Sequence, residues 1–459
     1  MMPRLNGQWR TSRTLRPFCI GFISALWLLK SLSAVPFCFA DDNTVDDTGM
    51  SLIETQWGGH LRGIGSTSYP DPESIYQWTG LDPYYDNQLE ARLKNNTFFG
   101  ARWSLETHLE VVGYGGDSLE KTSEFRSQYP EADGARLFGL SQTNDDQSLF
   151  NLTHTIIDEE DRRLFIRLDR LNLGYTSSWG SLRIGRQAMT WGGGLIFYPM
   201  DLFNPFSPST VMRDYKLGED MANLQALVGS GELQLVYVPR RELEGGEVDD
   251  AVSTYAAKWH QPFDTIEVDV MAARHYEDQI LGLGASGYLG GAAWRMDTVY
   301  THGGAAEDIV DYIQWLVNLD YAWQWLGHNV YGFVELYYNG LGKSEPYADA
   351  PADPYIQQRL QRGDQFTLGR TYVSGQLRFE HHPLVHSQWT FLLNTADASG
   401  FLQPQVIFDF ASNWQLLAGA ALYWGCDGSE FGGFSVSYDS MDFKIAPSDR
   451  LFLWLTYYF

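Results

Sequence analysis

Residues 313–338, which read IQWLVNLDYAWQWLGHNVYGFVELYY, carry the pattern that decides the fold. Over 313–323 every second residue is large and apolar, and the residues between them are mostly polar. This alternation is typical of a β-strand with one apolar face. The tetrapeptide LGHN at 326–329 predicts a tight turn, after which 330–338 resumes the alternation. Strands of about ten residues are long enough to cross a membrane when tilted.

The same unit, two strands joined by a short turn, recurs along the chain. We expect further short turns at 99–100, 178–180, 229–231, 261–263, 287–290, 382–383 and 412–413. Longer or more polar connections lie between them, at 113–161, 191–220, 240–250, 301–311, 339–365 and 425–449. This alternation of short and long connections is typical of outer-membrane barrels. A soluble propeller is the rival fold, but no repeat motif is visible.

We therefore predict an all-β chain that forms a transmembrane antiparallel β-barrel of about 18 strands (16–18). The short turns and both termini would face the periplasm, and the long loops would lie outside the cell. Closure of the barrel would remove the exposed edges that a large open sheet presents.

The C-terminus supports the same fold. Leu451, Leu453, Leu455, Tyr457 and Phe459 alternate with other residues up to a terminal phenylalanine. This ending resembles the signal by which the outer-membrane assembly machinery recognises its clients. We expect Leu455, Tyr457 and Phe459 to act as that assembly signal.

The first 40 residues are predicted to be a signal peptide, followed by one barrel domain at 41–459. Four arginines precede an apolar stretch at 18–29, and small residues lead to Ala40. A retained membrane anchor is the alternative, although the apolar stretch is shorter than the roughly 20 residues that a spanning helix needs. Cleavage would remove Cys19 and Cys38 and leave Cys426 alone, so no intramolecular disulfide is expected. The predicted location is the bacterial outer membrane.

The mature chain is strongly acidic. The segment 1–40 holds five basic residues and no acid, so its removal takes the formal charge from −25 to −30. This charge argues against nucleic acid as a partner. The expected partners are outer-membrane lipids, lipopolysaccharide and the barrel assembly machinery.

The connection 191–206, WGGGLIFYPMDLFNPF, is unusual for a surface loop. It is too apolar to lie in water, yet Pro199, Pro205 and Pro208 exclude a regular strand or helix. We predict that the loop near 191–220 folds inward and narrows the pore. A contact with another copy in a homo-oligomer is the alternative. The residues expected at the constriction are Phe197, Asp201, Phe203, Asn204, Pro205 and Phe206.

The strand before this loop poses a problem for strict alternation. If the apolar face at 182–184 continued, Arg186 would point at lipid, which costs about 2–4 kcal/mol near the middle of a bilayer. A bulge at Gly185 would shift the phase and turn Arg186 inward. Met189 and Trp191 would then face outward.

The preceding strand shows a matching break, because 164–168 and 171–175 alternate in opposite phases. We infer that the charged residues of both strands gather on the lumen wall. They are Arg163, Arg167, Asp169, Arg170, Arg183 and Arg186. Two interpretations stay open: a filter that orients and selects polar solutes, or internal ion pairs that hold the barrel together.

These two strands and the loop carry a resemblance. The stretches LRIGRQ at 182–187, WG at 191–192 and DLFNP at 201–205 resemble a signature of porin-like families of Gram-negative bacteria. The alginate-export family of 18-stranded barrels is similar in its Gly-Arg-Gln strand. This resemblance implies an 18-stranded barrel with arginines in the lumen. Because the chain is acidic, only a locally basic lumen would suit a polyanion such as alginate.

Two other motifs do not support a cofactor or metal site. Gly282, Gly284 and Gly287 match the dinucleotide fingerprint only in spacing, because no βαβ unit surrounds them. His381, His382 and His386 gather at an expected turn without the spacing of metal ligands. We predict no catalytic residue, no metal and no cofactor.

Three function classes remain. The chain is expected to be a channel, either a porin or an export pore, for small or oligomeric polar solutes. A transporter of hydrophobic compounds is the first alternative, since the apolar loop could bind them. An outer-membrane hydrolase is the second, although no catalytic set is assembled in the sequence.

Overall fold

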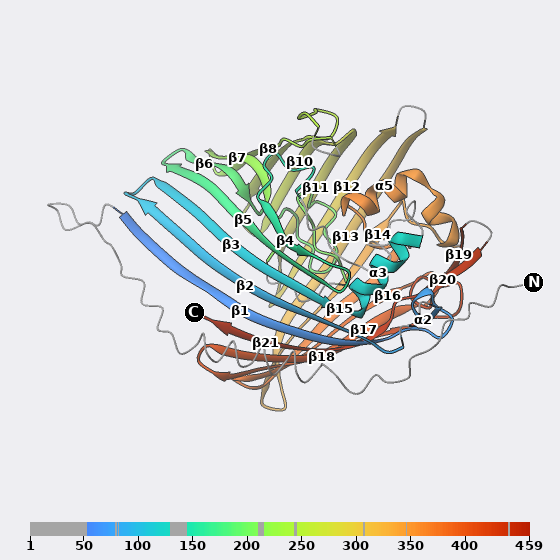
Figure 1. Ribbon diagram of the computed structural model, residues 1–459. Coiled ribbons are helices and arrows are strands. Elements are labelled where there is room, and N and C mark those ends of the chain that lie inside the picture. The colour runs from blue at the N-terminus through green and yellow to red at the C-terminus, as the bar shows by residue number, and fades with distance from the viewer. Residues whose placement is uncertain are drawn as a thin grey trace, which may run out of the picture. The chain divides into compact units, whose positions relative to one another are not determined.

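A computed structural model describes residues 53–78, 80, 82–128, 145–209, 215–242, 246–305, 308–345, 347–438 and 441–459. The expected signal peptide and its cleavage site lie outside these residues. Figure 1 shows the strands of the barrel running side by side with a common tilt.

Within the described residues, eighteen strands pair antiparallel in one closed cycle, so the predicted fold and strand number are confirmed. Each of these strands pairs with the strand before and after it, and β1 pairs with β21 to close the cycle, from His60 opposite Tyr458 to Tyr69 opposite Asp449. The strands are β1 (Ile53–Tyr69), β2 (Tyr84–Phe99), β3 (Trp103–Gly116), β5 (Arg162–Ser177), β6 (Gly180–Gln187), β7 (Glu219–Val228), β8 (Gly231–Val238), β9 (Thr254–Pro262), β10 (Ile266–His275), β11 (Asp278–Leu289), β12 (Ala292–Ala305), β13 (Asp308–Trp325), β14 (His328–Asn339), β15 (Thr371–His382), β16 (Val385–Asn394), β17 (Gly400–Ala411), β18 (Trp414–Trp424) and β21 (Asp449–Tyr458).

All eight predicted short turns are confirmed, because each joins two consecutive strands of the cycle through only two or three residues. One expected long connection is wrong. At 301–311 the pairing of β12 with β13 continues to Ala305 and Asp308, so the strands take up most of that stretch.

The long connections hold the remaining elements. They are α2 (Ile75–Trp78), α3 (Asp117–Gln128), β4 (Thr153–Asp158), the 3₁₀ helix η1 (Tyr347–Ala352), α5 (Pro354–Arg362), β19 (Phe434–Tyr438) and β20 (Met441–Ile445). Figure 1 shows α2, α3, α5, β19 and β20 together at the end of the barrel away from the start of β1. None of the helices in the described part of the chain is long and apolar enough to span a membrane.

The strand β4 pairs with the part of β5 that β6 is too short to reach. β6 is short and pairs with β5 only from Leu171 to Ser177, whereas β4 pairs with β5 from Arg163 to Arg167. β4 therefore continues the line of β6 toward the long loops. The chain after Gln187 is free to leave the wall.

The alternation of side chains sets the two faces of the wall. On β13, Ile313, Val317 and Tyr321 belong to one parity, are 41–47% exposed and face outward. Leu316 and Asn318, of the other parity, are at most 1% exposed and face the lumen. The interior is therefore filled, in part by the connection between β6 and β7.

Candidate functional site

The residues 188–218, here called the inner segment and described at 188–209 and 215–218, leave the wall after β6. Trp191 is 2% exposed, and its indole nitrogen donates a hydrogen bond of 2.8 Å to Gln234 on β8. Trp191 packs with Met200, Phe203 and other apolar residues of β7–β12. The expectation that Met189 and Trp191 face outward is wrong, because β6 ends at Gln187 and the alternation ends with it.

Glu335 on β14 binds the backbone of the inner segment at residues 195–197. Its carboxylate is fully buried and accepts hydrogen bonds from the backbone nitrogens of Leu195, Ile196 and Phe197 at 2.8–3.1 Å. A buried carboxylate is expensive unless it is hydrogen-bonded, and three successive N–H groups meet that need. Asn318 on β13 donates to the same carboxylate at 3.1 Å and to the carbonyl oxygen of Gly193 at 2.8 Å.

A second contact follows on β12, where Asp297 accepts a hydrogen bond of 2.8 Å from the backbone nitrogen of Gly193. The space around this part of the segment is tight. A Cβ on Gly193 would lie 2.8 Å from Cβ of Arg295, and one on Gly194 would lie 1.8 Å from the carbonyl oxygen of Phe197. Gly193 therefore lets the backbone approach the wall, and Gly194 lets the segment turn back closely on itself.

Phe197 fixes the segment to the far wall. Its ring stacks on Tyr337 of β14 with centroids 4.2 Å apart, and lies 5.3 Å from the ring of Tyr372 on β15. Leu316, Leu392 and other buried side chains complete this second apolar cluster. Aromatic contacts of this kind add about 0.5–1.5 kcal/mol to the burial of the rings.

A buried ion pair joins Lys216, near the returning end of the segment, to Asp201 in its middle. Lys216 donates to the carboxylate of Asp201 and to the carbonyl oxygen of Met189. Burial raises the pKa of Asp201 to about 6 even with Lys216 beside it, and burial also lowers the pKa of Lys216. Both shifts have one cause, which is that each charged form has lost its water.

The other residues predicted at the constriction divide by burial. Phe203 is 1% exposed and belongs to the first apolar cluster. Asn204, Pro205 and Phe206 are half-buried, and Asn204 has a left-handed φ of 55°. Asn204 lines a cavity of about 110 Å³, whereas Pro205 and Phe206 line one of about 40 Å³.

Tyr215 meets the opposite side of the lumen. Its hydroxyl accepts a hydrogen bond of 2.5 Å from Lys94 on β2, and the guanidinium of Arg92 lies 4.4 Å from the ring centroid. The ring also stacks on His60 of β1 with centroids 5.6 Å apart. The inner segment thus contacts the inward faces of β8, β12, β13, β14, β15, β1 and β2. The sequence offered no signal for Tyr215 or Lys94.

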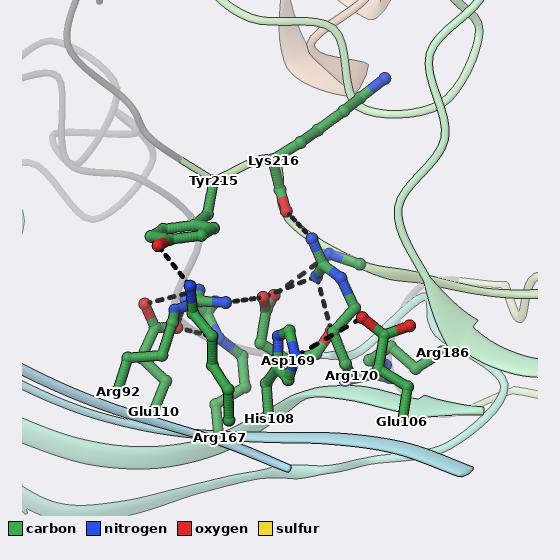
Figure 2. Close-up of polar contacts among 12 residues, drawn as sticks. Arg92, Glu106, His108, Glu110, Arg167, Asp169, Arg170, Arg186, Tyr215 and Lys216 are labelled. Carbon is green, nitrogen blue, oxygen red and sulfur yellow. Dashed lines mark hydrogen bonds and ion pairs between the residues drawn. The ribbon is translucent and has the colours of Figure 1, made fainter. Parts of the chain in front are cut away.

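Figure 2 shows the charged network beside Tyr215. Asp169 accepts hydrogen bonds from Arg92 at 2.8 Å, from Arg170 at 2.6 Å and from the backbone nitrogen of Gly218 at 3.1 Å. Glu110 on β3 accepts from Arg92 at 3.2 Å and from Arg167 at 2.6 Å. Arg170 also donates to the carbonyl oxygen of Lys216 at 2.6 Å. The network therefore joins the wall to the returning end of the inner segment.

Asp169 reaches this position through a bulge. The register of β3 and β5 shifts between His108, opposite Arg170, and Leu109, opposite Leu168, so Asp169 has no partner in the pairing. The phase break that the sequence indicated in β5 is therefore present. Arg92 and Glu110, which complete the network, were missed because they lie on strands without any phase break.

Arg186 is buried among different acids. Its guanidinium contacts Asp220 at 2.9 Å, Asp145 at 2.9 Å and the carbonyl oxygen of Phe150 at 2.7 Å. The expected bulge at Gly185 is wrong, because β6 pairs with β5 and β7 through this residue without a shift. Gly185 instead has a φ of +118°, and a Cβ there would lie 2.2 Å from the carbonyl oxygen of Leu171. The carboxylates of Asp145 and Asp220 compensate the charge of Arg186, so the residue can be buried without a shift of register.

The two remaining arginines lie apart from the network. Arg163 pairs with the exposed Asp158 of β4 at 2.8 Å. Arg183 is exposed and has no ion-pair partner among the described residues. It faces the lumen, because its partner on β7 is Asn223, whose side chain bonds to the lumenal Gln234.

The cavity beside Asn204 is polar. Arg167, Asp169, Arg186, Asp220 and Asp364 line part of its volume of about 110 Å³, which has room for several water molecules. In the part of the chain that the structure describes, no group of three or more His, Cys, Asp or Glu side chains could hold a metal ion. His381 bonds instead to Ser387 at 2.7 Å.

Neither a protein-family model nor a curated protein sequence matches the chain. Solved structures resemble it at low identity. In-vitro folded OmpT of Vibrio cholerae, in its trimer form, is 10% identical with a TM-score of 0.39, and the match covers 89% of this chain and 100% of OmpT. OccAB1 of Acinetobacter baumannii is 10% identical with a TM-score of 0.48, over 92% of this chain and 98% of OccAB1.

OccK9 (OpdG) of Pseudomonas aeruginosa is 13% identical with a TM-score of 0.48, over 88% of this chain and 98% of OccK9. At such identities no substrate can be carried over. The chain has the fold of a porin-like outer-membrane barrel, and its own closed cycle of eighteen strands is the basis for that statement.

Proposed function

We propose that this chain is an outer-membrane channel for small polar solutes, with the inner segment as its constriction. The observation that carries the proposal is the hold of Glu335 on three backbone N–H groups of that segment. A connection fixed to the opposite wall of a closed barrel narrows the passage at a defined height. The polar cavity of about 110 Å³ beside the segment suits water and small hydrophilic solutes.

The alternative of a transporter for hydrophobic compounds is less well supported. It required the apolar side chains of 195–206 to be available as a binding surface. Ile196, Phe197, Leu202 and Phe203 are at most 6% exposed and are already packed against the wall. Their burial serves the fold of the segment, and the same packing argues against a contact with another subunit.

The sequence left two roles open for the lumenal arginines, internal ion pairs and a filter for polar solutes, and the arginines divide between them. Arg167, Arg170 and Arg186 have carboxylate partners on the same wall, which supports the role of internal ion pairs. Arg183 has no such partner among the described residues and is the arginine best placed to act on passing anions. A polyanion such as alginate would need a locally basic lumen, and the charges of Arg167, Arg170 and Arg186 are already compensated by carboxylates.

Leu455, Tyr457 and Phe459 would be read by the assembly machinery, and the signal peptide would direct export to the outer membrane. The outer wall would contact lipid, including lipopolysaccharide.

Planar bilayer recordings and liposome swelling with the purified mature chain test this function. We expect discrete conductance steps, and swelling in small sugars but slower swelling in trisaccharides. A folded barrel that admits neither ions nor sugars would contradict the channel proposal. Uptake of a hydrophobic dye without ion conduction would favour the alternative transporter.

A further inference from the structure

The outer wall over β7–β12 contains an apolar groove of about 850 Å³. Its floor is formed by Ala257 on β9 and Ala272 on β10, which lie directly opposite each other. Larger outward residues continue the same row on both sides, with Leu235 on β8 and Leu281 on β11 next to the alanines. Because methyl groups replace long side chains at the centre of the row, the wall is hollowed there.

The next row toward the long loops is polar and aromatic. It runs from Tyr237 and Tyr255, whose rings stack with centroids 4.7 Å apart, to Arg274, Gln279 and His302. An arginine on a lipid-facing wall is tolerated near the interface and not at the middle of a bilayer. Arg274 is the last residue but one of β10, so it lies at that interface.

Around this rim the acidic side chains of Asp250 and Asp311 already have partners, whereas the cation Arg274 does not. Asp250 accepts a hydrogen bond of 2.7 Å from the hydroxyl of Tyr255, and Asp311 lies 2.6 Å from Nδ1 of His302. Arg274 is exposed and has no carboxylate partner among the described residues. A second, smaller outward groove, lined by Ala418 of β18 and four other apolar residues, has no charged residue in its lining.

We propose that the β7–β12 groove binds an acyl chain of a phosphorylated lipid A molecule, with a lipid phosphate on Arg274. The proposal rests on the proposed membrane location and on long loops that face the outer leaflet. The apolar floor suits an acyl chain, and a guanidinium pairs with phosphate in a bidentate geometry. A second copy of the chain would have to supply both an apolar ridge and an acid for Arg274.

Native mass spectrometry of the mature chain in detergent, titrated with diphosphorylated lipid A, tests the site. We expect Ala257→Trp to fill the groove and to reduce bound lipid A at least fivefold. The matched control is Ala418→Trp, which fills the uncharged groove and should leave binding unchanged. Arg274→Gln should weaken diphosphorylated lipid A about fivefold but not its dephosphorylated form, and Arg274→Lys should restore part of the difference.

Heat-modifiable migration in gels verifies that each variant is folded. Equal binding by Ala257→Trp and Ala418→Trp would overturn the site, and equal binding of phosphatidylglycerol would overturn the choice of lipid A. An oligomer that only Ala257→Trp disrupts would assign the groove to a second copy instead. Because binding is measured in detergent, a barrel that fails to conduct would end the channel proposal without changing this result.

Discussion

The carboxylate of Glu335 on β14 lies 2.8 Å from the backbone nitrogen of Phe197, although the two residues are 138 positions apart. Glu335→Ala would leave three buried N–H groups of the inner segment without acceptors. Each unsatisfied group costs about 1–3 kcal/mol, so the segment should leave its place before the barrel unfolds. We expect the single-channel conductance to at least double.

The control is Glu267→Ala, which removes an exposed carboxylate from β10 without touching the inner segment. Its conductance should equal that of the wild-type chain. If Glu335→Ala forms a heat-modifiable barrel with wild-type conductance, the segment does not set the width of the passage.

Arg183 and Arg186 separate selectivity from stability. Arg186→Gln breaks buried ion pairs with Asp220 and Asp145, and removal of one partner of a buried pair costs about 3–5 kcal/mol. We expect a clear fall in the urea midpoint of unfolding. Arg183→Gln removes an exposed cation, so it should leave the midpoint unchanged and lower the ratio of chloride to potassium permeability.

Reversal potentials measure the ion selectivity of both variants, and urea unfolding measures their stability. A change of selectivity in Arg186→Gln alone, at unchanged stability, would mean that the roles are exchanged.

The sequence predicted what depends on neighbouring residues. The alternation at 313–323 gave the outward face of β13 correctly, because the period of a strand is a local property. The phase break in β5 was also visible, since a bulge changes the alternation of the strand that contains it. At Gly185 the same reasoning failed, because the charge of Arg186 is compensated by Asp145 and Asp220 and not by a shifted register.

What the sequence could not provide is the pairing of distant residues. Nothing around Glu335 indicates that its carboxylate meets 195–197, and nothing around Lys94 indicates Tyr215. The inner segment was recognised by its composition alone. Its composition predicted burial but not which strands would hold it, since those contacts exist only once the barrel has closed.

The ion pair of Asp201 with Lys216 predicts a dependence on pH. Burial raises the pKa of Asp201 to about 6, whereas in a released segment it would return to its ordinary value of about 3.9. The inserted state therefore binds more protons, so its stabilisation is present at low pH and is lost as the pH rises through about 6. We expect fewer and shorter open events at about pH 5 than at about pH 7.5.

Single-channel recordings at the two pH values measure this effect. Asp201→Asn removes this titrating group and should reduce the difference in open-state occupancy between the two values. The same pH dependence in Asp201→Asn would show that another group is responsible.

The seam between β1 and β21 provides a test of assembly. Phe459 exchanges backbone hydrogen bonds with Gly59, at 2.9 and 3.1 Å. A Cβ on Gly59 would lie 2.1 Å from the carbonyl oxygen of Arg92 and 2.7 Å from the ring of Phe459, so Gly59→Ala should impair closure. Gly63→Ala on the same strand is the control, because its nearest neighbour, the Leu89 side chain, lies at 3.7 Å.

Phe459→Ala separates closure from recognition by the assembly machinery. It removes a half-exposed ring without adding a clash, so the purified chain should still refold in detergent at nearly the wild-type yield. If the terminal aromatic residue is read during assembly, the amount of folded barrel in outer-membrane fractions should nevertheless fall severalfold. Equal losses in detergent and in cells would mean that Phe459 serves only the seam, and no loss in either would remove Phe459 from both roles.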